Sequence, residues 1–309
     1  MKVAGRCVTA EAPHSTVLGT APGHPSRRVR MGKPPKLRVL DVADVPLREV
    51  SGLALLGTEL LAVGDRDPML FVAPLEPWPP CWRGIDLTGL ALPDGGTQFE
   101  ALESVDRTSV LILQEQPARV LHLDVTRPAL LGTMQLDVPD DHRLREMWLG
   151  DRSSRGESLI LADRGHLLVV KEKDPMAILE FGPAGDAPVG WRAGVAPPAL
   201  PPGDRTLTVL ATWWPAPELS RWLPDISDAT VGPDGHLYLL SDQGSSIARL
   251  PASLDAAGGS VDAEAVWRIA GAPDKAEGLA LLDDGTPLIG LDTKSPRRNL
   301  LRLERLSGG

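Results

Sequence analysis

Cysteine is nearly absent from this chain of 309 residues, which contains only Cys7 and Cys81. Two cysteines so far apart give neither a disulfide framework nor a metal-ligand spacing, and they fit a reducing compartment. The chain also lacks an apolar run long enough to span a membrane. Residues 1–35 lack the apolar core of a secretory signal. We therefore expect a cytoplasmic protein with no membrane span.

Positive charge is in deficit, because 32 Lys and Arg residues stand against 41 Asp and Glu residues, a net charge of −9. An acidic chain of this kind is a poor partner for nucleic acid, and we expect no nucleic-acid binding. Residues 1–35 are rich in Pro, Gly, Ser, Thr and His and are predicted to form a disordered tail. Residues 36–306 are predicted to form a single domain, since closed all-β rings commonly exceed 250 residues.

A short pattern recurs along the chain. Residues 276–292 read as two apolar strands joined at Asp284-Gly285, a strong hairpin signal. Similar hairpins precede it at irregular steps of 49 to 70 residues, and the five copies begin at Ser51, Glu100, Glu157, Ser227 and Glu277. Self-similarity at a period near 50 residues is typical of a repeat architecture.

Each copy has room for two further strands, such as 119–123 and 130–136 in the second copy. Four antiparallel strands per repeat indicate an all-β fold, a β-propeller of four-stranded blades. We expect five blades, and six is the alternative if the proline-rich stretch 182–225 forms another. The last copy ends after three strands, so the strand predicted over 36–42 is expected to complete it and close the ring.

Acidic residues recur at two positions of each copy. In a propeller blade the start of the first strand and the end of the second lie at one end, so two rings of side chains are expected there. The first ring is Ser51, Glu100, Glu157, Ser227 and Glu277; the second is Asp65, Glu115, Glu172, Asp242 and Asp292. A turn at Asp284-Gly285 would place Glu277 opposite Asp292, where like charges repel.

A cation would relieve this repulsion, and oxygen ligands without a His or Cys cluster favour Ca²⁺ first and Mg²⁺ second. We expect Glu100, Glu157, Glu277 and Asp292 to ligate the metal. Other residues at this end are candidates for ligand binding, namely Ser51, Ser227 and Asp242. The alternative for the second ring is structural, because an acid that ends a strand often accepts backbone N–H groups of the following turn.

Tryptophans and histidines are further candidates for functional roles. Trp213 and Trp214 either pack against outer strands or form an aromatic wall for a ligand on the channel face. His166 and His236 follow turn glycines on the face away from the acids, and we expect both to be exposed.

Five segments, in order, resemble the SdiA-regulated propeller proteins over about residues 40–305. They are Val50-Ser51-Gly52-Leu53, Phe99-Glu100-Ala101-Leu102, the run 169–175, Asp225-Ile226-Ser227-Asp228-Ala229 with Leu239-Leu240-Ser241-Asp242, and Ala276-Glu277-Gly278-Leu279-Ala280. The resemblance implies a propeller centred on a channel, an associated calcium site and a poorly defined biochemical role. More distant six-bladed propellers include calcium-dependent lactonases and phosphoesterases, and they imply a hydrolase by analogy.

Two functions follow. The first is a non-catalytic propeller whose acidic channel mouth binds Ca²⁺ and a small-molecule or protein ligand. The alternative is a metal-dependent hydrolase of a lactone, ester or phosphoester, with Glu277 or Glu157 as the base. The sequence leaves open whether the protein is an enzyme.

Overall fold

The computed structural model describes residues 32–90, 92, 98–140, 142–150, 155–196, 198–271 and 275–307. The chain divides into Met1–Gly32 and Lys33–Gly309, and every strand described below belongs to the second unit. Residues 1–31 of the predicted tail, Cys7 among them, lie outside the described residues. No helix among the described residues is long and apolar enough to cross a membrane.

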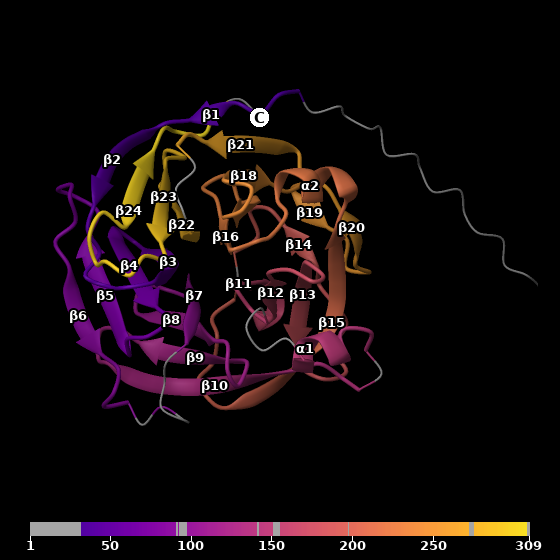
Figure 1. Cartoon of the computed structure of the whole chain (residues 1–309). Coiled ribbons are helices and arrows are strands. Elements are labelled where there is room, and N and C mark those ends of the chain that lie inside the picture. Colours follow the sequence, from indigo (N-terminus) through magenta and orange to yellow (C-terminus); the bar gives the residue numbers. More distant parts are fainter. Residues whose placement is uncertain are drawn as a thin grey trace, which may run out of the picture. The chain divides into compact units, whose positions relative to one another are not determined.

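The described strands form five four-stranded antiparallel blades around a common axis (Figure 1). The first blade is β3 (Val50–Leu56), β4 (Glu59–Gly64), β5 (Met69–Pro74) and β6 (Arg83–Asp86). The second is β7 (Phe99–Ser104), β8 (Ser109–Gln114), β9 (Arg119–Asp124) and β10 (Ala129–Asp137). The third is β11 (Ser158–Leu161), β12 (Leu167–Lys171), β13 (Ala177–Gly182) and β15 (Arg205–Pro215). The fourth is β16 (Asp228–Val231), β17 (Leu237–Ser241), β18 (Ser246–Arg249) and β21 (Ala265–Ile269).

The fifth blade joins the two ends of the described chain. It contains β22 (Ala276–Leu281), β23 (Pro287–Leu291) and β24 (Leu300–Leu303), and β2 (Val39–Ala43) completes it from the N-terminal side. The prediction of a five-bladed ring closed by an N-terminal strand is thus confirmed. The predicted strand over 36–42 is divided, however, because β1 (Lys36–Leu37) pairs in parallel with β21 of the fourth blade.

The stretch 182–225 does not form a sixth blade. Its main strand, β15, is the outermost strand of the third blade and pairs in parallel with β10 of the second. Smaller elements surround it: β14 (Trp191–Arg192), which pairs with β19 (Ser253–Leu254), and β20 (Gly259–Val261), which pairs with the end of β15. Two short helices, α1 (Arg145–Gly150) and α2 (Pro217–Trp222), and a 3₁₀ turn at Asp163–Gly165 complete the described elements.

The core consists of apolar layers between neighbouring blades. Side chains of a strand alternate between its two faces, so a strand between two such layers must be apolar on both. In β8, Val110 and Ile112 pack towards the first blade, whereas Leu111 and Leu113 pack towards the third. This arrangement explains why the second strands of the repeats are continuous apolar runs.

The innermost strands β3, β7, β11, β16 and β22 contact one another in a closed cycle. They approach closely at one repeated position, the residue after each first-ring residue. A Cβ added to Gly52 would lie 2.9 Å from the backbone nitrogen of Leu102 in the next blade. At the same position of the third blade, the hydroxyl of Ser158 donates to the carbonyl of Ala229 and accepts from its N–H, both at 2.9 Å.

A glycine substitution tests this inner contact. We expect Gly52→Ala to lower the free energy of unfolding by about 1–3 kcal/mol, because the new methyl group would overlap the backbone of β7. Gly89→Ala is the control, since a Cβ there meets nothing within 4 Å. Chemical denaturation of both variants would measure the difference, and equal stabilities would contradict the close approach of the inner strands.

Candidate functional site

The first-ring residues lie where each inner strand begins, and three of them occupy a β-bulge. The pairing of inner and second strands shifts register across Ser51, Glu100 and Glu277, so each is an extra residue on its strand. A bulge turns its side chain out of the regular alternation and is common next to functional sites. Glu157 and Ser227 come directly before β11 and β16, and their N–H groups donate to Val170 and Leu240 at 3.0 Å.

The predicted pairing of Glu277 with Asp292 is wrong for two reasons, the length of the turn and this bulge. Leu282 donates its N–H to the carbonyl of Thr286 at 3.0 Å and Leu281 pairs with Pro287, so the turn contains three residues and the register differs by one residue from that of a two-residue turn. Ala276 pairs with Leu291 and Gly278 with Gly290, which leaves Glu277 without a cross-strand partner. Asp292 instead donates its N–H to the carbonyl of Lys275 at 2.9 Å. The sequence indicated correctly that a hairpin forms here, but residue spacing revealed neither the length of its turn nor the bulge.

The glutamates of the first ring converge around the axis. The pKa of Glu100 is raised to about 9, first by burial and then by repulsion from Glu115 and Asp65, with Glu277 also contributing. Burial likewise raises the pKa of Glu157 well above its ordinary value, and repulsion from Glu100 adds to the effect. These side chains therefore lie within electrostatic reach of one another. We call Glu100, Glu157 and Glu277 the glutamate cluster, and this end of the molecule the acid end.

The pKa of Glu277 is raised less than that of Glu100. The Glu277 pKa is raised to about 8, by burial first and by repulsion from Asp292 next, while the ammonium of Lys275 lowers it. Among the described residues, we find no hydrogen bond or ion pair to the carboxylates of the glutamate cluster. Three partly buried acids without such partners carry a large cost when ionised.

The second-ring acids are different, because most of them have partners. Lys275 forms an ion pair with Asp292, and Lys173 forms one with Glu172 at 2.7 Å. Arg66 approaches Asp65 at 3.7 Å. These contacts fit the structural alternative for the second ring, and they leave Asp292 less available as a metal ligand than the glutamate cluster.

The three ligand-binding candidates at this end make structural hydrogen bonds. The hydroxyl of Ser51 donates to the carbonyl of Glu49 at 3.2 Å. Between the fourth and fifth blades, Ser227 donates to the carbonyl of Ala276 at 2.7 Å, and Asp242 accepts from its N–H at 3.0 Å. The bonds of Ser227 and Asp242 join neighbouring blades, whereas that of Ser51 is local, and all three candidates contribute to the frame of the site.

Trp213 and Trp214 do not lie with the acids. Both belong to β15, the outermost strand of its blade, and Trp213 is buried and donates its indole N–H to the carbonyl of Asp255 at 2.9 Å. The guanidinium of Arg143 lies 3.9 Å from the ring centre of Trp214. Both tryptophans therefore pack against neighbouring segments at the outside of the blade. They do not form a wall of the channel, because an outer strand cannot line the axis.

Two further acids of the inner strands, the half-buried Glu103 and the buried Asp228, are not among the predicted site residues. Burial raises the pKa of Glu103, in β7, to about 8. It raises the pKa of Asp228 well above its ordinary value, although Asp228 accepts a hydrogen bond from the N–H of Leu279 at 2.6 Å. A signal was available, because both are acids inside predicted inner strands, where apolar or small residues are expected.

A directly coordinated metal is not preformed at the acid end. Among the residues that the structure describes, no group of three or more His, Cys, Asp or Glu side chains is arranged to hold a metal ion. The carboxylates are close enough to repel one another but not gathered around one point.

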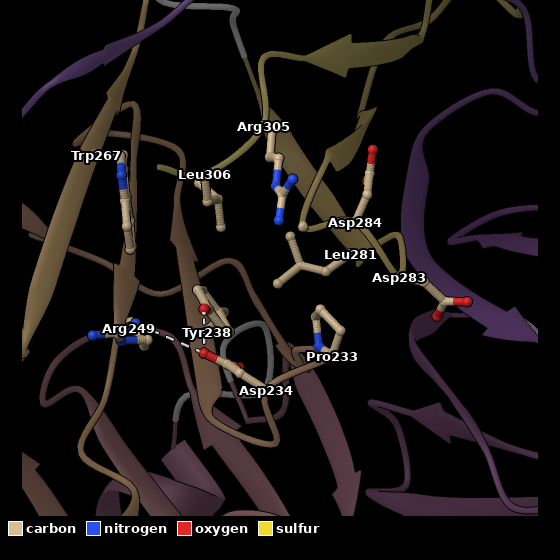
Figure 2. A pocket seen from close by; sticks show the side chains of 11 residues that line it. Pro233, Asp234, Tyr238, Arg249, Trp267, Leu281, Asp283, Asp284, Arg305 and Leu306 are labelled. Carbon is tan, nitrogen blue, oxygen red and sulfur yellow. Dashed lines mark hydrogen bonds and ion pairs between the residues drawn. The ribbon is translucent and has the colours of Figure 1, made fainter. Parts of the chain in front are cut away.

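Two cavities lie at the opposite end, near the hairpin turns that join the inner and second strands. The smaller, of about 180 Å³, lies between the fourth and fifth blades (Figure 2). Its wall contains Tyr238 and Trp267, stacked with ring centres 6.2 Å apart, and Tyr238 donates to Asp234 at 3.0 Å. The larger cavity, of about 670 Å³, lies between the third and fourth blades.

Five four-stranded blades around one axis define the chain as a β-propeller. No family model and no curated protein matches it. Among solved structures it is similar to glutaminyl cyclase of Myxococcus xanthus, with 13% identity over 88% of this chain and 98% of that chain and a TM-score of 0.51. It is equally similar to the PQQ-bound aldose sugar dehydrogenase of Streptomyces coelicolor, with 13% identity, coverage of 88% and 99%, and a TM-score of 0.51.

The WD40 β-propeller domain of Doa1 is also similar, with 10% identity over 86% of this chain and 96% of that chain and a TM-score of 0.42. At these identities the first two likenesses show the fold alone. The resemblance to the SdiA-regulated proteins stays a prediction.

The pKa values predict how stability depends on pH. Since the pKa of Glu100 rises from an ordinary 4.5 to about 9 on folding, the folded state binds more protons between these values. The free energy of unfolding must then fall as the pH rises through this window. We expect Glu100→Gln to raise the melting temperature at pH 9 by at least about 2 °C, and to change it less at pH 5.

Thermal melting at pH 5, 7 and 9 would measure this effect. Glu146→Gln, at an exposed position of α1, is the control and is expected to change little. A Glu100→Gln variant that melts in parallel with the unmodified protein at every pH would show that this carboxyl is not buried among other acids.

Proposed function

We propose that the protein is a non-catalytic β-propeller whose acid end binds a cation together with a small-molecule or protein ligand. The observation that supports this proposal is the contrast between the two rings of acids. Most second-ring acids are paired with cationic side chains or backbone N–H groups, whereas the glutamate cluster has no such partner among the described residues. A bound cation would supply the missing countercharge.

Protons are the competing occupants of the cluster. With pKa values of about 9 and about 8, Glu100 and Glu277 are mostly protonated at neutral pH. A cation that binds carboxylates must displace these protons, so its affinity rises with pH. The acid end thus couples cation binding to proton release.

Ca²⁺ is the first candidate and Mg²⁺ the second. All the donors of the cluster are oxygens, which suits a hard cation, and Ca²⁺ accepts six to eight ligands in flexible geometry, water included. The carboxylates are not gathered around one point, so the ion would be held partly through water, or after side-chain rotation. Mg²⁺ demands a stricter octahedron, which ranks it second.

Calorimetric titration of Ca²⁺ into chelator-treated protein tests this proposal. We expect binding at pH 8 that weakens at least tenfold at pH 6, with proton release, and that weakens at least tenfold in Glu100→Gln and in Glu277→Gln. Glu146→Gln is again the control. Absence of heat at pH 8, with no shift in melting temperature on adding Ca²⁺, would refute a calcium site.

A hydrolase is the second candidate, and one observation favours it. A carboxyl with a pKa of about 8, as Glu277 has, can act as a general base through its ionised form, whose share grows as the pH rises towards 8. Bound Ca²⁺ would polarise the carbonyl or phosphoryl oxygen of a lactone, ester or phosphoester. Glu277 would then take a proton from the attacking water, with Glu157 as the other candidate base.

A screen of lactones, aryl esters and phosphoesters separates the two functions. Under the binding proposal we expect no turnover with or without Ca²⁺. Turnover that is abolished by a chelator and by Glu277→Gln would establish the hydrolase instead. Calcium binding without turnover on any of the three substrate classes supports the non-catalytic function.

A further inference from the structure

The larger cavity, of about 670 Å³, is a groove formed by three segments that are far apart in the sequence. They are the 3₁₀ turn at Asp163–Gly165, the stretch 188–195 and the stretch 253–256. Pairing of β14 with β19 joins the last two, because Trp191 lies opposite Leu254 and Arg192 opposite Ser253. A volume of this size lies within the range of small-molecule sites.

A buried ion pair fixes one wall of the groove. His166 was expected to be exposed, but both its side chain and that of Glu180 are fully buried, with Nδ1 of His166 2.7 Å from Oε1 of Glu180. The two oxygens of Glu180 also accept the N–H groups of Val189 at 2.7 Å and Gly190 at 2.9 Å. These hydrogen bonds hold the chain at 189–190 in the position where it lines the groove.

The imidazolium state of His166 suits this arrangement. The hydrogen bond to Glu180 raises the pKa of His166, and Asp186, with Oδ2 3.3 Å from Nε2, adds to the effect. Breaking a buried pair of this kind is strongly destabilising, yet such a pair contributes little net stability compared with an apolar core. The effect of the His166–Glu180 pair is to hold residues 189–190 in one conformation, and these residues form the wall of the groove.

The groove has charges of both signs around an apolar wall. Arg164 and Arg192 line it, and neither has an ion pair or hydrogen bond from its guanidinium among the described residues. Asp163 and Asp255 line it too, and each uses Oδ1 to accept a backbone N–H, from Arg164 at 2.7 Å and Ala257 at 2.9 Å. Their second oxygens have no hydrogen bond among the described residues.

We propose that this groove is a second binding site, for a short zwitterionic peptide with an apolar side chain. The free carboxylate pairs with Arg164 and Arg192, which suit bidentate recognition of a carboxylate. The ammonium group pairs with Asp163 or Asp255, and the apolar side chain lies against Val189 and Leu254. The balance of two arginines and two aspartates favours a zwitterion over a simple anion or cation.

The site is independent of the function proposed above. It lies at the end of the blades that carries the hairpin turns, and it shares no residue with the glutamate cluster. A failed calcium titration therefore leaves it unaffected, and a failed peptide titration leaves the calcium proposal unaffected.

Calorimetric titration with leucyl-leucine, N-acetyl-leucyl-leucine and leucyl-leucine amide tests the proposal with the full-length protein. We expect leucyl-leucine to bind, and the acetylated and amidated forms, which each lack one charge, to bind at least tenfold more weakly. Arg164→Gln and Arg192→Gln are each expected to weaken leucyl-leucine binding at least tenfold. Both positions are exposed, so the variants should fold normally.

Arg107→Gln is the matched control, because Arg107 occupies the corresponding exposed turn between the inner and second strands of the second blade. We expect it to bind leucyl-leucine like the unmodified protein. No heat at millimolar peptide, equal binding of the three peptides, or equal binding by the arginine variants and the control would overturn the proposal.

Discussion

The close approach of five inner strands around one axis is the constraint on which the rest of the structure depends. A ring of this size leaves room for little more than backbone and small side chains at the contact positions, as Gly52 and Gly278 show. Where the position is polar, the side chain bonds to the neighbouring strand, as Ser158 and Asp228 do. The inner ring is therefore held by packing and by hydrogen bonds that pass from blade to blade, and any group at its mouth is brought near its equivalents.

The acids at the mouth follow from that geometry. A carboxylate at the start of one inner strand would be well hydrated if it were alone, but the ring places Glu100, Glu157 and Glu277 within reach of one another. Burial and repulsion from nearby acids, Asp292 in the case of Glu277, then act in the same direction and raise the pKa of each. The molecule tolerates this cost although cationic side chains lie nearby, since Lys275 and Lys173 pair with the second ring instead. An acidic cluster left without its own counterions is a feature that folding alone does not require.

The two ends of the blades differ in chemistry because one is formed by the starts of the inner strands and the other by turns and loops. At the acid end, the inner strands begin at equivalent positions, so polar residues, three of them glutamates, recur around the axis. At the other end, the hairpin turns and the segments beside them differ from blade to blade, and they line individual cavities between particular pairs of blades. The buried pair of His166 and Glu180 belongs to this second kind of structure, since it anchors a segment found only in the third blade. A repeat architecture can thus carry one cluster of acids shared by several blades and one cavity local to two of them.

The sequence by itself determined the repeat, the order of the strands within each blade and the closure of the ring, because apolar runs and turn residues act locally. It also placed the recurring acids at one end. Tertiary structure alone decided the bulges at Ser51, Glu100 and Glu277, since these arise when an inner strand fits against both its partner and its neighbour. It likewise decided the burial of His166, which depends on a segment 20 residues further along folding back over it. Local patterns fix which residues form strands, whereas burial and charge proximity depend on which distant segments meet.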